Sequence, residues 1–283
     1  MTYLATLGVG LCFTFVYFFV MRALILRLDL KTPGREDERP RWEQGLSPAP
    51  NDHVVGAVCA LGHKGNRSFV CTGRPPGGIH PMISCMPFSG FVTLAGAYVT
   101  MGSRVLRNEP IPAELLDAVD RVLRKQGRGA RLEGLQKVIE VRDGTDGRAA
   151  RSAASMAEAL RQQPSGRAYK VILPTAAADA VMADPGLARE LSASALELGN
   201  SELGLASNTK KAGIRAALSA LGPDAGTTYG FGDAENDLPL FAEVDVRVAM
   251  GNAVDALKAR ADYVTGSVHE DGVVSGLAHF GLI

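Results

Sequence analysis

GFGDAENDLP, at residues 230–239, is the stretch that decides the fold of this chain. In it Asp233 and Asp237 stand four apart with Asn236 between them, directly after the apolar run 227–231. The run predicts a buried strand that ends at Asp233, and open α/β sheets bind their ligands at that end of a strand. Asp237 and Asn236 would fall on the first turn of the following helix. Such hard oxygen ligands suit Mg²⁺, although Asp and Asn are also common helix caps.

The composition indicates a globular chain that does not bind nucleic acid. Its 283 residues are enough for one large domain or two smaller ones, and an apolar content of 46% supports a core. Lys plus Arg and Asp plus Glu number 30 each, and no basic stripe with interleaved aromatic residues occurs. The four cysteines form no CxxC pair and the histidines show no zinc spacing, which predicts reduced thiols in a cytoplasmic protein.

The first 21 residues form an apolar extension with more than one interpretation. Residues 4–20 carry no charge, and a run of that length is at the lower limit for a membrane span. No linker separates it from residues 23–30, which predict a buried strand. The run is therefore a membrane anchor, a packed helix, or an extension upstream of a chain that begins at Met21. We expect a cytoplasmic protein, with a membrane-anchored one as the alternative.

The order of the predicted elements indicates an α/β fold. Short apolar runs typical of buried parallel strands occur at residues 23–30, 68–71 and 90–94. From about residue 102 the pattern changes to that of a small inserted α+β unit. The βα alternation resumes at Lys210 and predicts a doubly wound parallel sheet. The expected parts are an extension at 1–21, a core at 22–98 and 208–283, and the inserted unit at 99–207.

The residues that carry chemistry occur in four pieces along the chain: LILRLDLKT, SFVCTGRP, SNTKKAGIRAALSALG and GDAENDLPLF. Thr72 lies at a strand end, with Gly73 and Arg74 behind it. A strand-end hydroxyl and Lys210 can hold phosphoryl oxygens, and a carboxylate cluster can hold the metal that neutralises their charge. The plainer alternatives are a strand end at Thr72, an ordinary surface Arg74, and a solvated charge at Lys210 or Lys211.

At these motifs the chain resembles the Cof-type phosphatases of the haloacid dehalogenase superfamily. The resemblance covers residues 21–283 and is carried by ELGLASNTKKAGIRAALSALG, GFGDAENDLPLF, VAMGNAVDALKARADYVT and HEDGVVSGL, with CTGRPPGG and PFSGFVTLAGAYV before them. It implies a Rossmann-like core with an inserted cap domain. It also implies Mg²⁺-dependent hydrolysis of a small phosphorylated metabolite, such as a sugar phosphate, through an aspartyl-phosphate. The oligomeric state is left open.

The resemblance also implies roles for individual residues. Thr72 would contact the phosphoryl group, and Lys210 would stabilise its charge and orient the nucleophile. Asp233 would bind Mg²⁺, supported by Asp237 and Asn236. The implied substrate-binding residues are Thr72, Gly73, Arg74, Lys210 and Asn236. The inserted unit would be the cap that closes over the site and selects the substrate.

The nucleophile motif of the family, DxDGT, is missing from the end of the first expected strand. If residues 27–29 take its place, Arg27 stands at the nucleophile position and the protein is inactive. If residues 29–31 do, Asp29 is the nucleophile and a metal ligand, but Lys31 replaces the general acid and base. A cation so close would weaken Mg²⁺ binding. We expect a phosphatase that uses Asp29. The alternatives are an inactive relative that binds a phosphorylated ligand, and a membrane-tethered version of either.

A smaller departure lies in PFSGFVTLAGAYV. Ala95 stands where the family's NGA segment usually has an asparagine. We therefore expect a local hydrogen bond of that asparagine to be missing from this chain.

Overall fold

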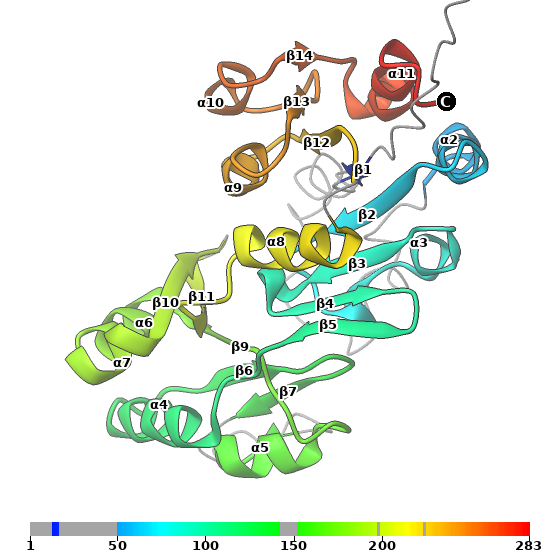
Figure 1. The fold of residues 1–283 in the computed structure, drawn as a ribbon. Coiled ribbons are helices and arrows are strands. Elements are labelled where there is room, and N and C mark those ends of the chain that lie inside the picture. The colour runs from blue at the N-terminus through cyan, green and yellow to red at the C-terminus, as the bar shows by residue number, and fades with distance from the viewer. Residues whose placement is uncertain (1–12, 17–49, 142–151, 197–198, 223–224) are drawn as a thin grey trace, which may run out of the picture.

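Two β-sheets organise the chain in the computed structural model, which describes residues 13–16, 50–141, 152–196, 199–222 and 225–283 (Figure 1). The first sheet has eight strands in the order β14-β13-β12-β1-β2-β3-β4-β5, and the second has six. The strands of the first sheet are β1 (Phe13–Val16), β2 (Arg67–Cys71), β3 (Gly90–Thr93), β4 (Tyr98–Met101), β5 (Arg104–Asn108), β12 (Thr228–Gly232), β13 (Val246–Ala249) and β14 (Tyr263–Val264).

The first sheet is doubly wound, as the βα alternation predicts. Strands β14 to β3 pair in parallel, whereas β4 and β5 form an antiparallel hairpin at the edge. Helices α8, α9 and α10 lie on one side of the sheet and α2, α3 and α11 on the other (Figure 1). Their bounds are α2 (Asp52–His63), α3 (Pro81–Cys85), α8 (Lys210–Leu221), α9 (Leu238–Phe241), α10 (Asp255–Lys258) and α11 (Gly272–His279). Apolar side chains from both sides fill the core.

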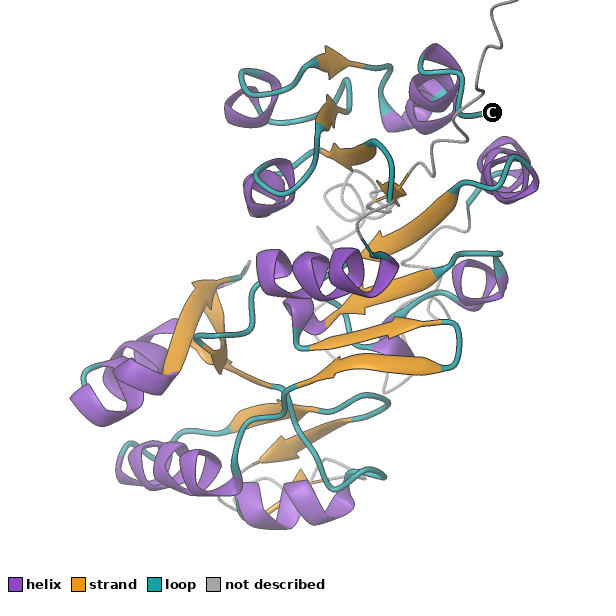
Figure 2. Cartoon of the chain, in the orientation of Figure 1, coloured by secondary structure: helices purple, strands orange, loops and turns teal. Residues whose placement is uncertain are grey.

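Within the described ranges, the second sheet carries its helices on one face. Its order is β10-β11-β9-β6-β7-β8. The strands are β6 (Ala130–Glu133), β7 (Val138–Val141), β8 (Ser152–Ala153), β9 (Lys170–Pro174), β10 (Leu191–Ala195) and β11 (Asn200–Leu205). The helices are α4 (Ala113–Lys125), α5 (Met156–Gln162), α6 (Thr175–Met182) and α7 (Pro185–Glu190). Figure 2 shows these helices beside the strands of this sheet, and together they form a second core. The α/β class with an inserted α+β unit is confirmed, while the boundary at residue 98 stays a prediction; β4 and β5 continue the first sheet beyond it.

The centre of the first sheet differs from the sequence-based expectation. Strand β1 lies between β12 and β2, with Val16 opposite Phe231 on one side and Val70 on the other. These residues belong to the apolar run for which a packed helix or a membrane span was considered, so a helix through them is wrong. The strand expected at 23–30 lies outside the described residues. Within the described ranges, no helix is both long and apolar enough to cross a bilayer.

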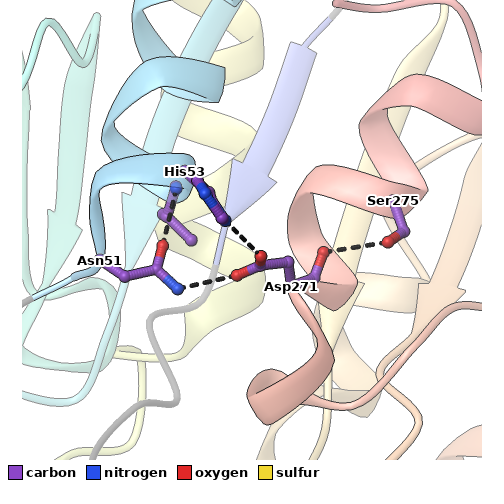
Figure 3. Close-up of polar contacts among 5 residues, drawn as sticks. Asn51, His53, Asp271 and Ser275 are labelled. Atoms are coloured by element: carbon purple, nitrogen blue, oxygen red, sulfur yellow. Dashed lines mark hydrogen bonds and ion pairs between the residues drawn. The ribbon is translucent and has the colours of Figure 1, made fainter.

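A polar cluster joins the N-terminal ends of α2 and α11 (Figure 3). His53 Nδ1 and Asn51 Nδ2 lie 2.6 and 2.7 Å from the two carboxylate oxygens of Asp271. Asn51 also caps α2, because its Oδ1 accepts a hydrogen bond from Val54 N at 2.9 Å. The hydrogen bond with Asp271 raises the pKa of His53, and the same contact lowers the pKa of Asp271. The cluster thereby ties together two helices from distant parts of the sequence.

Candidate phosphoryl-binding site

Four of the predicted residues gather at the carboxyl edge of the first sheet. Thr72 directly follows β2, Asp233 directly follows β12, and Lys210 is the first residue of α8. Asp237 ends the short 3₁₀ turn Glu235–Asp237 that follows Asp233. All four side chains are buried. This edge is the place where parallel α/β sheets bind ligands, so the sequence-based placement of these residues agrees with the structure.

A buried ion pair joins Lys210 and Asp237 at the centre of the described part of the site. The Lys210 Nζ donates to Asp237 Oδ1 at 2.6 Å. The other carboxylate oxygen, Oδ2, accepts from the backbone N–H groups of Asp233 and Ala234 at 3.1 and 3.3 Å. Both oxygens of Asp237 therefore have protein partners, and Asp237 fixes the loop that carries Asp233 as well as the lysine.

The thiol of Cys71, the last residue of β2, lies close to this pair. Burial raises the pKa of Cys71 to about 12, an increase that the Lys210 charge partly offsets and the Asp237 charge reinforces. The thiol therefore stays protonated at neutral pH and is no nucleophile, since the thiolate is the reactive form. Its side chain packs in the apolar core of the first sheet.

Two glycines allow the start of α8 to pack closely enough to place Lys210 at the site. Gly96 has a φ of 95°, and a Cβ there would lie 2.1 Å from the carbonyl oxygen of Thr209. A Cβ on Gly213 would lie 2.6 Å from Val92 Cγ1 and 2.7 Å from Gly96 Cα. The start of α8 therefore rests on the backbone of the 3₁₀ turn Leu94–Gly96, an approach that only glycine permits.

The loop after β2 presents a hydroxyl group and a half-buried cation. Thr72 Oγ1 accepts a hydrogen bond from Arg74 N at 3.2 Å, which fixes its orientation. No described residue accepts the hydroxyl hydrogen of Thr72, so it is available to a bound oxygen. The Arg74 guanidinium is half-buried and donates to the carbonyl oxygen of Gly78 at 3.3 Å. Gly73 contributes its backbone, and its carbonyl oxygen accepts a hydrogen bond from Lys170.

The segment that carries Ala95 takes up a conformation unusual for its residues. Leu94 and Ala95 have φ values of 52° and 54°, in the left-handed region. Asparagine enters this region more readily than alanine does. Ala95 N donates to the carbonyl oxygen of Thr72 at 3.1 Å, so the turn supports the phosphoryl-binding loop despite the substitution.

Two further predicted site residues, Asn236 and Asp29, are not shown among the buried groups of the site. The side chain of Asn236 is exposed, and Asp29 lies outside the described residues. Among the residues that the structure does describe, no group of three or more His, Cys, Asp or Glu side chains could hold a metal ion. The buried Asp233, at the sheet edge, still fits Mg²⁺, which needs only one or two carboxylates and takes its other ligands from water and phosphate.

Three charged residues near the site were missed by sequence reasoning: Glu133, Lys170 and Glu202. They belong to the second sheet, and Lys170 contacts the loop after β2 through the carbonyl oxygen of Gly73. The available signal was a charged residue inside an apolar strand, as in YKVIL around Lys170. Alternation along a strand places such a residue on the face opposite the core.

Comparison with known proteins identifies the family. The profile described as haloacid dehalogenase-like hydrolase matches residues 50–277. The chain belongs to this family. The match confirms the resemblance to Cof-type phosphatases and the class of hydrolase. It starts after the segment in which the nucleophile was sought, so it assigns no residue to that role.

The relatives of this chain differ in the share of its length that they match. YkrA of Bacillus subtilis (strain 168), a phosphatase by name, is 28% identical over 244 residues, 80% of this chain and 89% of YkrA. The solved sugar phosphatase BT4131, of HAD subclass IIB, has a TM-score of 0.64 and 23% identity, covering 82% of this chain and 92% of its own. A stretch of 31 residues is 71% identical to the PTS system alpha-glucoside-specific EIICB component of Klebsiella pneumoniae. That stretch covers 11% of this chain and 6% of that protein, and carries no argument about activity.

Proposed function

We propose that this chain is a Mg²⁺-dependent phosphohydrolase that acts on a small phosphomonoester, such as a sugar phosphate, through an aspartyl-phosphate formed on Asp29. The observation that supports it is the gathering of Thr72, Lys210 and Asp233 at one edge of the sheet. The names of YkrA and BT4131 favour a phosphatase and a sugar phosphate. A cytoplasmic location belongs to the proposal, because its substrate is a phosphorylated metabolite.

The residues of this chain divide the work of binding the phosphoryl group. Thr72 donates its hydroxyl hydrogen to one phosphoryl oxygen. Lys210, held in place by Asp237, supplies a fixed positive charge for the others. Gly73, Arg74 and the exposed Asn236 contact the rest of the substrate.

Asp233 and Asp29 are the residues that would hold Mg²⁺, with Asp237 in a supporting position. A bound Mg²⁺ supplies charge that neutralises the phosphoryl oxygens. Asp237 acts mainly through its hydrogen bonds to the Asp233 loop and to Lys210, since those contacts occupy both of its oxygens. Asp233 is therefore the metal ligand that we assign most directly.

The test is hydrolysis of p-nitrophenyl phosphate by the full chain, with and without Mg²⁺. The full chain is needed because a start at Met21 would remove strand β1 from the centre of the sheet. We expect metal-dependent turnover that Asp29→Asn abolishes and Asp233→Asn lowers strongly. Turnover that survives Asp29→Asn would refute the assignment of the nucleophile.

A catalytically inactive relative is the second candidate, and strand β1 favours it. In this family the strand before the nucleophile ends at the site, and here β1 ends at Val16 between β12 and β2. The sequence then runs from 17 to 28 without a carboxylate before it reaches Asp29. Absence of turnover together with phosphate binding that Lys210→Met weakens would support this candidate over the first.

A further inference from the structure

One face of the second sheet carries charged side chains instead of helices. Leu132, Val171 and Leu203 point into the helix-covered core of that sheet. Their strand neighbours Glu133, Lys170 and Glu202 therefore lie on the opposite face. Glu133 pairs directly with Lys170 in the register of β6 and β9.

This charged face is seated on the loop that follows Thr72. Lys170 Nζ donates to the carbonyl oxygen of Gly73 at 2.8 Å and to Glu202 Oε2 at 2.7 Å. Next to it, Gly77 N donates to the carbonyl oxygen of Leu135 at 2.8 Å. A Cβ on Gly77 would lie 2.8 Å from Gln136 Cα, so the turn between β6 and β7 rests on the loop. The end of β6 is thereby fixed beside the phosphoryl-binding residues.

Glu133, at the end of β6, is buried and lacks a hydrogen-bond partner in the described chain. Only 8% of the residue is exposed, and its carboxyl group makes none of the hydrogen bonds that its neighbours Lys170 and Glu202 share. Among the described residues, the carboxyl oxygens of Glu133 are not counted with the fully enclosed atoms that lack a partner, so they keep an opening to solvent. A polar group of a ligand can therefore reach this carboxyl group and hydrogen-bond to it.

The charges around Glu133 define the kind of partner. Burial raises the pKa of Glu133 to about 7; the positive charges of Lys170, Arg131 and Arg74 lower it and the charge of Glu202 raises it. Near neutral pH the carboxyl group can thus donate a hydrogen bond when protonated or accept one when ionised. Such a group suits a neutral hydroxyl, which both donates and accepts, better than a second phosphate, which a carboxylate repels.

We propose that Glu133 recognises a hydroxyl group on the leaving group of the substrate, so that the site selects polyol or sugar phosphates over phosphomonoesters without hydroxyls. The inference rests on the proposed function only in that Thr72 and Lys210 hold the phosphoryl group. Lys170 positions Glu133 by tying its sheet to Gly73. The three together form a subsite beside the phosphoryl group rather than around it.

The test uses binding, so that it does not depend on turnover. Calorimetry with the full chain and Mg²⁺ would compare two stable probes. One is a phosphonate analogue of glucose 6-phosphate, which carries the sugar hydroxyls, and the other is methylphosphonate, which lacks them. The variants are Glu133→Ala and Glu133→Gln, with Glu140→Ala as the matched control. Glu140 lies on the neighbouring strand β7, opposite Arg131.

We expect Glu133→Ala to weaken binding of the sugar phosphonate about tenfold, the effect of one lost hydrogen bond, and to leave methylphosphonate within about twofold. Glu133→Gln, which can also donate and accept, should restore most of the loss, and Glu140→Ala should bind both probes as wild type does. Equal weakening of both probes, no effect, or a wild type that binds both equally or neither would overturn the inference. Failure of the proposed catalysis is separate, since it would leave this binding pattern intact but abolish turnover of p-nitrophenyl phosphate.

Discussion

Lys210 and Asp237 form an ion pair of 2.6 Å in which the side chains are only 6% and 1% exposed. Both charges are shielded from bulk water, so their attraction to each other contributes to the stability of both. The pair also joins the start of α8 to the loop after β12. This ion pair therefore contributes to the stability of the fold and also fixes the positions of the site residues.

Breaking that pair should be costly. Asp237→Asn removes a negative charge that contacts the buried Lys210 ammonium at 2.6 Å, and we expect a loss of about 3 kcal/mol or more in the free energy of unfolding, measured by urea denaturation. The control is Asp262→Asn, which removes the carboxylate partner of Arg247 in an ion pair whose side chains are 40% and 41% exposed. That change should cost less than about 1 kcal/mol. Equal losses in the two variants would contradict the role of burial.

The positions of several site residues were predictable from the sequence because these residues stand directly after apolar strands. Thr72 directly follows SFVC and Asp233 directly follows TYGFG, and the bounds of both strands lie within one residue of the predicted ones. Strand β1 was not predictable, because a uniformly apolar run does not reveal which four of its residues pair with other strands. Nor was the contact of Lys170 with Gly73, since it joins two sheets and no sequence spacing encodes such a contact.

Gly96 should be intolerant of a side chain. Gly96→Ala places a methyl group 2.1 Å from the Thr209 carbonyl oxygen, at a φ of 95°. We expect a loss of about 3 kcal/mol, from overpacking and the left-handed backbone together, and weaker phosphate binding because Lys210 follows Thr209. Gly102→Ala is the control: its φ is 54° and nothing lies within 4 Å. It should cost only about 1 kcal/mol and leave binding unchanged. Similar losses at both glycines, read from urea denaturation, would refute the packing argument.

Replacing Ala95 with glycine should stabilise the protein. Its φ of 54° costs an alanine about 1–2 kcal/mol, which glycine does not incur. Ala95→Gly should therefore raise the melting temperature slightly, by the equivalent of about 0.5 kcal/mol after the added flexibility of the unfolded chain is subtracted. Ala183→Gly, at a right-handed φ of −72°, should lower it. Lowered stability in both variants would show that Ala95 is unstrained.

Glu133 should make stability depend on pH in a direction opposite to most carboxyl groups. Its folded pKa, about 7, lies above the ordinary 4.5, so its stabilising contribution is complete below pH 4.5 and is lost as the pH rises to 7. Relative to wild type, Glu133→Gln should therefore gain about 3 kcal/mol between these values, since each pKa unit corresponds to about 1.4 kcal/mol. Urea denaturation at pH 4.5, 5.5 and 7 would measure the difference.

The control for this prediction is Glu270→Gln. Hydrogen bonds from Ser267 lower the pKa of Glu270, so its contribution is present above its ordinary pKa and lost as the pH falls. Relative to wild type, this variant should lose stability as the pH rises, the reverse of Glu133→Gln. If Glu133→Gln ran parallel to wild type from pH 4.5 to 7, burial would not raise the pKa of Glu133. If its curve had the same sign as that of Glu270→Gln, the folded pKa would lie below the ordinary 4.5. In that second case the carboxyl group would contact a cation more closely than the structure shows.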